Sequence, residues 1–156
     1  MDVSGLPKLT LLDYPGRVAC TVFTGGCNLR CPFCHNASLA LPGRERDVIG
    51  HEELMAFLKK RVGILDGVAV TGGEPLLHAG LEGLLSEIKA LGYAVKLDTN
   101  GTFPARLRAI VEAGLADRVA MDIKASPERY AAVTGVPGLD LGPIKESVAY
   151  LMACGV

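Results

Sequence analysis

Three cysteines, Cys27, Cys31 and Cys34, lie close together in the sequence in a C-x3-C-x2-C arrangement. Thiols at this density can bind a metal ion or an iron–sulfur cluster, or form a disulfide or a redox pair. Pro32 favours an extended backbone at Cys31, which works against a helix through the motif. A loop of this length can wrap around one compact object and present three thiolates to it.

The rest of the cysteine inventory separates these possibilities. Cys20 and Cys154 lie among apolar residues and fit ordinary buried positions, and an odd total of five excludes a complete disulfide framework. A structural zinc site needs four ligands, and His35 directly follows Cys34, where it is poorly placed to be the fourth. A four-iron cluster on three thiolates leaves one iron open for chemistry. Zinc stays open as the alternative.

The composition indicates one domain over residues 1–156, with 49% hydrophobic and 21% charged residues. The net charge is −1 and no block of Lys and Arg is present, so nucleic acid is not expected as a partner. No apolar run approaches the ~20 residues of a membrane span. The first residues lack the pattern of a signal peptide, which predicts a cytoplasmic protein with reduced cysteines.

Short apolar runs alternate with segments of helical periodicity. The runs predicted to be buried strands are 18–23, 68–71, 94–97 and 119–123. The segments predicted to be helices are 52–61, 81–91, 104–114 and 143–155. This alternation predicts right-handed βαβ units and a parallel sheet. Residues 9–17 are expected to be an extended piece that turns through Asp13–Gly16, and 41–47 a charged loop.

Each predicted strand runs into a polar segment. These segments are TGGCNLRCPFCHN (24–36), TGGEP (71–75), DTNG (98–101) and DIK (122–124). In parallel α/β sheets, ligands bind at the carboxyl ends of the strands, so four polar ends in series predict one site. Gly25 and Gly26 allow close backbone approach in the first segment, and we expect their N–H groups to point at sulfur.

These motifs together resemble those of a known family. C-x3-C-x2-C with Phe33 directly before the last cysteine is similar to the signature of the radical S-adenosylmethionine (SAM) enzymes. CHN at 34–36 and DYPG at 13–16, with TGGEP and DTNG, narrow the resemblance to the glycyl-radical-enzyme activases. The sequence is most similar to activating proteins of anaerobic ribonucleoside-triphosphate reductase, which are relatives of pyruvate formate-lyase activating enzyme. The resemblance runs from about Leu9 to Cys154.

The resemblance implies an α/β fold of the partial (β/α) TIM-type barrel kind with parallel strands. Such a barrel has more strands than the four predicted here, so we expect a radical SAM core domain that stops before its C-terminal strands. The resemblance also implies a 4Fe–4S cluster that reductively cleaves SAM to a 5′-deoxyadenosyl radical, which generates a glycyl radical on a partner enzyme. The expected partner is anaerobic ribonucleotide reductase, and the expected electron donor is a flavodoxin or ferredoxin.

Two other functions remain open at this point. One is a radical SAM reaction on a small molecule, and the other is a non-catalytic iron–sulfur or zinc module. The activase chemistry requires no general acid or base, and the sequence shows neither a Ser-His-Asp constellation nor a paired-carboxylate one.

The resemblance assigns the cluster and part of the SAM site. Cys27, Cys31 and Cys34 would each bind one iron, and the fourth iron would bind the amino and carboxylate groups of SAM. Phe33 would lie near the adenine, with a buried aromatic that packs the loop as the alternative. The SAM amino group would be received by three residues of the TGGEP segment, Gly72, Gly73 and Glu74.

Two further sets of residues are implied in the same way. Asp98, Thr99 and Met121 match positions that bind a monovalent cation beside the SAM carboxylate, where Met121 would use its backbone carbonyl. The alternative is a tight turn after Thr99 and a core role for Met121. Asp122 and Lys124 would hold the cofactor, with Lys124 on the SAM carboxylate, and they alternatively form a surface ion pair.

Strand periodicity places the two residues of this last pair on one side of the fourth strand. His35 is a candidate to support the cluster or to play a structural part, and His51 and His78 are assigned no role.

Overall fold

The computed structural model describes residues 1, 3–41 and 48–156, and its centre is a five-stranded, mostly parallel sheet. The spatial order is β1-β2-β3-β4-β5, with β1 and β5 at the two edges. β1 (Val3–Gly5) is antiparallel to β2 (Ala19–Thr24), and the other neighbours are parallel. The remaining strands are β3 (Gly67–Gly72), β4 (Ala94–Thr99) and β5 (Arg118–Met121). The predicted α/β class with parallel strands is confirmed.

Four long helices follow the predicted segments closely: α2 (His51–Arg61), α3 (Leu81–Ala90), α4 (Pro104–Glu112) and α6 (Gly142–Cys154). Shorter helical turns complete the described chain: α1 (Ala37–Ala40), η1 (Pro75–Leu77), η2 (Pro127–Arg129) and α5 (Tyr130–Thr134). Gly92 and Gly114 have φ of 88° and 67° just after α3 and α4, the left-handed conformation that glycine commonly adopts where a helix ends. Except for Leu41, the charged loop expected at 41–47 lies outside the described residues.

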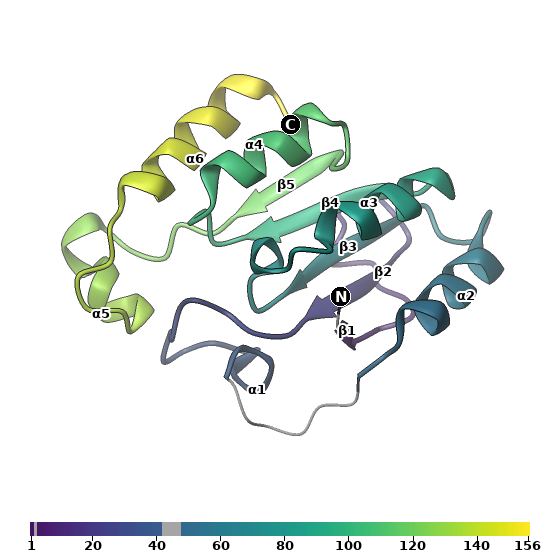
Figure 1. Ribbon diagram of the computed structural model, residues 1–156, viewed down its shortest axis with the longest axis horizontal. Helices are drawn as coiled ribbons and strands as arrows, with labels where there is room; N and C mark the ends of the chain where they lie inside the picture. The colour runs from purple at the N-terminus through teal and green to yellow at the C-terminus, as the bar shows by residue number, and fades with distance from the viewer. Residues whose placement is uncertain (2, 42–47) are drawn as a thin grey trace.

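The sheet buries one face against the helices. In Figure 1, α3 and α4 lie in front of the strands. Val68, Val70, Val95 and Leu97 point to that side and form one core with leucines and isoleucines of α2, α3 and α4. The side chains between them in the strands point to the opposite face, because strand periodicity is two.

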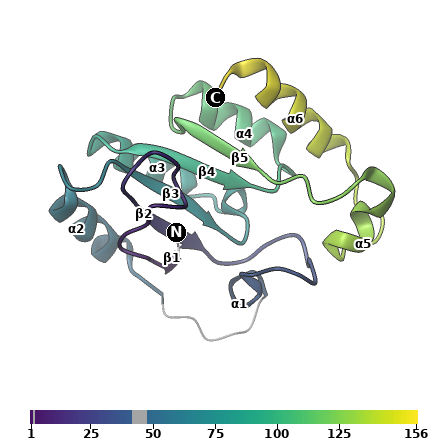
Figure 2. The same ribbon diagram turned by 180° about the vertical axis from the view of Figure 1, so that it is seen from behind.

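The N-terminal segment lies on the opposite face, as Figure 2 shows from behind. Thr10 pairs with Ala19 in an antiparallel bridge, so the expected extended piece is present. Tyr14 is buried against Gly67, where an added Cβ would come within 3.0 Å of the ring. The N–H of Arg17 then donates to the Tyr14 carbonyl (3.1 Å) and closes the turn that leads into β2.

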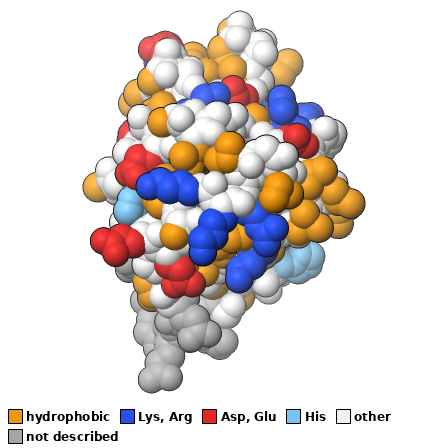
Figure 3. Space-filling model, turned by 90° about the vertical axis from the view of Figure 1, so that its right-hand side faces the viewer, with side chains coloured by type: hydrophobic (Ala, Val, Ile, Leu, Met, Phe, Trp, Pro, Cys, Tyr) orange, Lys and Arg blue, Asp and Glu red, His pale blue; other side chains and the backbone are white. Residues whose placement is uncertain are grey.

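The amino ends of the strands lie on the right of Figure 1, and Figure 3 views the molecule from that side. Basic side chains gather near the middle of this surface, with acidic and hydrophobic side chains beside them. Within the described ranges, no helix has both the length and the apolar character needed to cross a membrane. The carboxyl ends of the strands point the other way, and the polar segments meet there.

Candidate functional site

A cavity of about 520 Å³ opens at the carboxyl ends of the parallel strands. This volume lies within the ~300–1,000 Å³ typical of ligand pockets. Residues from all four predicted polar segments line it, namely Cys27, Cys31, Cys34, Gly72, Gly73, Asp98, Thr99, Asp122 and Lys124, among others. The four strand ends therefore meet at one cavity, as their polar composition predicts.

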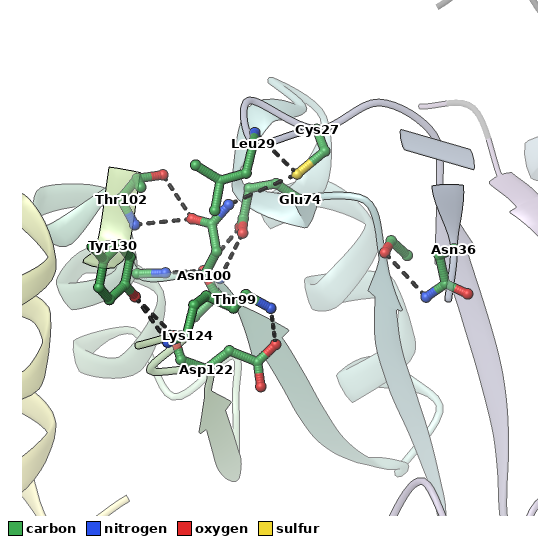
Figure 4. Close-up of polar contacts among 12 residues, drawn as sticks. Cys27, Leu29, Asn36, Glu74, Thr99, Asn100, Thr102, Asp122, Lys124 and Tyr130 are labelled. Carbon is green, nitrogen blue, oxygen red and sulfur yellow. Dashed lines mark hydrogen bonds and ion pairs between the residues drawn. The ribbon is translucent and has the colours of Figure 1, made fainter. Parts of the chain in front are cut away.

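The three motif cysteines are free thiols on the wall of this cavity. The N–H of Leu29 points at the Cys27 sulfur (3.4 Å), and the side-chain amide of Asn100 lies 3.9 Å from the same sulfur (Figure 4). The expectation that Gly26 supplies such a contact is wrong, because its N–H donates to the Leu39 carbonyl (2.7 Å). The contacts to this sulfur come from Leu29 within the motif and from Asn100 after β4, and not from Gly26.

The surroundings of Cys27 and Cys31 favour the protonated form of their thiols in the absence of a metal. Burial raises the pKa of the Cys27 thiol, and the Leu29 N–H offsets only part of the rise. Burial also raises the pKa of Cys31, against the attraction of the Lys124 ammonium. A metal centre would therefore displace protons as it binds, as is usual for thiolate ligands.

Among the residues that the structure describes, no three His, Cys, Asp or Glu side chains are grouped so that they could share one metal ion. In a 4Fe–4S cluster each thiolate binds a different iron, so the ligands need not converge on one point. The three free thiols on one wall suit that kind of centre.

The two glycines of TGGEP allow two loops to pack backbone against backbone. A Cβ on Gly73 would lie 1.8 Å from the Gly26 carbonyl oxygen, and one on Gly72 would lie 2.3 Å from that of Thr24. In return, the N–H of Gly73 donates to Thr24 O (3.0 Å) and that of Glu74 to Gly26 O (2.9 Å). Glycine is needed here because a side chain would push the segment after β3 away from the cysteine loop.

Glu74 is fully buried and bonds to its own neighbours. Its carboxylate accepts hydrogen bonds from the N–H of Leu76 (3.0 Å), the hydroxyl of Thr99 (2.9 Å) and the N–H of Asn100 (2.7 Å). Burial raises the pKa of this carboxyl, although the hydrogen bonds oppose the rise. Glu74 is not part of the cavity lining, so the geometry does not support the expected contact with a ligand amino group. The resemblance of the TGGEP segment and the negative charge of Glu74 had suggested that contact.

Asn100 connects the loops after β2 and β4, a role that its sequence context, typical of a turn, does not indicate. Its side-chain amide donates to Asn28 Oδ1 (2.8 Å), and Asn28 Nδ2 donates to the Thr102 hydroxyl (2.8 Å). That hydroxyl donates to Asn100 Oδ1 (2.7 Å) and closes the network (Figure 4). A polar residue that is only 5% exposed needs such partners, but the sequence gives no sign of its burial.

Two of the residues expected to bind a monovalent cation, Asp98 and Thr99, are already engaged. The Asp98 carboxylate is paired with Lys96, two positions earlier in the same strand. Burial raises the pKa of Asp98, and Lys96 opposes the rise. The Thr99 hydroxyl, bound to the buried glutamate, also accepts from the N–H of Gly101 (3.1 Å). The Met121 side chain fills the space beside Gly101.

Asp122 and Lys124 follow β5 rather than lie in it, because the strand ends at Met121 and not at 123 as predicted. Their side chains form an ion pair of 2.6 Å at the cavity, so the ion-pair alternative describes their contact. The Tyr130 hydroxyl holds the segment by accepting from Lys124 N (3.2 Å) and donating to Asp122 O (3.4 Å) (Figure 4).

The ammonium of Lys124 stays charged in this position. Burial disfavours its charged form, but the pair with Asp122, together with the attraction of Cys31 and Cys34 when they are ionised, outweighs burial and leaves the pKa above its usual value. The cavity thus presents a protonated amine close to the cysteines, which suits an anionic group of a ligand.

The remaining candidates lie at the rim or away from it. Phe33 lines the cavity and is 55% exposed, so the alternative of a buried aromatic is wrong. His35 also lines the cavity, whereas His51 lies at the start of α2. His78, which was assigned no role, bonds through Nε2 to the Gly25 carbonyl (2.8 Å) and supports the cysteine loop.

Comparison with known proteins identifies the family. A family model described as the Radical SAM superfamily matches residues 21–156. A protein of Methanocaldococcus jannaschii, provisionally named a glycyl-radical enzyme activating enzyme, is 35% identical over 133 residues, which cover 82% of this chain and 52% of that protein. The GTP 3′,8-cyclase of Aquifex aeolicus is 36% identical over 152 residues, which cover 90% of this chain and 45% of that one.

The fold has a counterpart among solved structures. The structure of TYW1 with a lysine-pyruvate adduct bound matches with a TM-score of 0.60 at 15% identity, covering 86% of this chain and 51% of that one. The sheet is the open, partial form of the predicted (β/α) barrel. The chain spans about half the length of the curated relatives it matches.

Proposed function

The chain belongs to the radical SAM superfamily, and we propose that within it the chain is the core of a glycyl-radical-enzyme activase whose partner is an anaerobic ribonucleotide reductase. The cofactors of the superfamily are a 4Fe–4S cluster and SAM, which together supply a carbon radical able to remove a hydrogen atom from a substrate. The observation that carries the activase assignment is the 35% identity to the Methanocaldococcus protein across 82% of this chain.

The residues present fit these cofactors. Cys27, Cys31 and Cys34 would hold the cluster, as three free thiols on one wall of a cavity large enough for a ligand beside it. Lys124 is protonated next to these thiols and would bind the SAM carboxylate. Phe33 is exposed on the lining, where its ring is available to the adenine.

The protein itself would orient the cofactor and its reacting partner. Tyr130 fixes the backbone on both sides of Ile123, whose side chain lines the cavity and is 65% exposed. This leaves an apolar rim beside the thiols. Such a rim suits a polypeptide segment better than a highly charged small molecule, because desolvating charge against it is costly.

A small-molecule reaction is the second candidate, favoured by the 36% identity to the Aquifex GTP 3′,8-cyclase. A nucleoside triphosphate needs several cationic groups. The described cavity lining contributes Asp98 and Asp122 against a single lysine, Lys124, which is already paired. This charge balance favours the activase proposal within the part of the site that the chain builds.

The two candidates differ in what stimulates SAM turnover. We would reconstitute the protein with iron and sulfide without oxygen, reduce it, and measure 5′-deoxyadenosine release with either purified anaerobic ribonucleotide reductase or GTP. We expect the reductase to stimulate release and to acquire a glycyl-radical EPR signal, and the Cys31→Ser variant to give neither. Release stimulated by GTP, with the reductase EPR-silent, would overturn the activase assignment in favour of the second candidate.

A further inference from the structure

Lys96 is a buried lysine in the middle of β4. It is 8% exposed and lies on the sheet face opposite the helices. Lysine is almost never this buried unless it is paired. Its ammonium is paired with Asp98, which points to the same side because the two residues are two positions apart in the strand.

The pair has a defined orientation relative to the cavity. Asp98 lines the cavity and also accepts a hydrogen bond from the Thr71 side chain. Lys96 precedes it by two positions in β4 and is not part of the cavity lining. In the register of the sheet, Lys96 is level with Ala69 on one side and Arg118 on the other. The small alanine leaves room for the lysine side chain to extend along the sheet toward the cavity.

We propose that Lys96 is a tethered counter-ion that replaces a bound monovalent cation at Asp98, so that the cofactor site works without an alkali metal ion. The inference rests on the assignment of the cavity as the SAM site, but not on the identity of the radical's final acceptor. A potassium or sodium ion at Asp98 would sit against a fixed ammonium, and the two like charges would repel each other in a half-buried setting.

The remaining candidate ligands point the same way. The Thr99 hydroxyl donates to Glu74 and accepts from Gly101, which leaves it little capacity to bind a metal ion. Asp122, the other carboxylate of the cavity lining, has its own lysine at 2.6 Å. Each carboxylate of the lining is thus matched by a lysine of the chain, and no further cation is needed for neutrality.

The test compares cations of the same charge but different size. We would measure thermal unfolding of the native protein, Lys96→Met and Lys89→Met in chloride salts of potassium, sodium or tetramethylammonium at equal ionic strength. Lys89 is the matched control because it pairs with Asp117 (2.6 Å) away from the cavity. This readout needs neither cluster nor SAM.

For the native protein, and likewise for Lys89→Met, we expect the melting temperature to be the same in all three salts. Lys96→Met should melt lower in tetramethylammonium and recover in potassium or sodium, because an ion bound only by the folded state stabilises it. Equilibrium dialysis with reconstituted protein should show the same pattern for SAM. We expect Lys96→Met to bind SAM about tenfold more weakly until potassium is added, and native binding to be unaffected by the choice of salt.

Two results would overturn the proposal. One is a native protein whose melting temperature or SAM affinity depends on potassium over tetramethylammonium, since a metal ion would then bind with Lys96 in place. The other is a Lys96→Met variant that no alkali ion restores, which would make Lys96 only structural. If that variant fails to fold, the native measurements still test the claim. A failed activase assay would not change the melting temperatures or SAM affinities, so the two proposals can fail separately.

Discussion

Single residues hold the loops of the site together from behind the cavity. Glu74 accepts one hydrogen bond near its own position, one from Thr99 at the end of β4 and one from Asn100 directly after it. Asn100 binds the same carboxylate through its backbone and reaches Asn28 and Cys27 through its side chain. The Glu74 carboxylate therefore binds donors of the protein itself. Other residues, such as Lys124, line the cavity and face a ligand.

Replacing the buried carboxylate tests this view. In Glu74→Gln, one of the two acceptor oxygens becomes an amide that can only donate, so a donor in the loop loses its partner. We expect a loss of about 2 kcal/mol in the free energy of unfolding, the usual range for a hydrogen bond to a charged group. Urea denaturation would measure it. The exposed Glu112→Gln is the control, expected to stay within about 0.5 kcal/mol of the native protein.

Asn100 is expected to influence the cluster as well as the fold. Asn100→Ala removes the amide near the Cys27 sulfur and the bond to Asn28. Hydrogen bonds to cluster sulfurs raise the reduction potential, so the variant should have a more negative midpoint in an EPR-monitored titration. Asn100→Asp, which brings negative charge to the same place, should shift it further in that direction. An unchanged midpoint in both variants would show that this amide does not act on the cluster.

At the level of elements, the site depends on how closely the loops after β2 and β3 pack. The N–H groups of Gly73 and Glu74 donate to carbonyls at the end of β2 and in the loop after it, and no room exists for a side chain at Gly72 or Gly73. The helices α2, α3 and α4 contribute no residue to the cavity lining. They cover the other face of the sheet and fix the strands from which these loops emerge.

A methyl group at this contact should separate the loops. Gly73→Ala places a Cβ against the Gly26 carbonyl, so we expect a loss of about 3 kcal/mol in unfolding free energy and poor cluster incorporation. Gly83→Ala is the matched control, because this glycine lies in α3 with open space around its Cβ. It should stabilise the protein by about 0.5–1 kcal/mol. Equal effects of the two changes, measured by denaturation, would contradict the close-contact argument.

The sequence predicts the strongly periodic elements and misses the short ones. The four long helices and four parallel strands have apolar patterns that only one structure satisfies, and the structure confirms them. β1, α1 and α5 contain too few residues to show a period, and tertiary contacts determine them. β5 ends at Met121. The Asp122 N–H still donates to the Thr99 carbonyl of β4 (3.1 Å), but the Asp122 carbonyl and the Lys124 N–H then bond to the Tyr130 hydroxyl instead of continuing the sheet.

For the whole molecule, the location of the site is predictable because parallel strands all end on one side. The polar residues after each strand therefore had to meet, and they line one cavity. The role of each residue at the cavity was harder to predict from the sequence. AVKL (94–97) has the pattern of an apolar strand, so the lysine within it gave no sign that it would pair with Asp98 at the cavity. Burial and pairing depend on neighbours that the linear sequence does not place.

The proposed function depends on three thiols that hold a four-iron cluster with one iron free for SAM. The most direct test is the EPR spectrum of the reconstituted, reduced protein with and without SAM. We predict a reduced 4Fe–4S signal that changes shape on addition of SAM. The signal should persist in Cys154→Ser, because this cysteine lies outside the motif and is exposed rather than buried as its apolar neighbours predicted, and it should disappear in Cys34→Ser. A colourless protein with one bound zinc, or a cluster whose spectrum ignores SAM, would contradict the account.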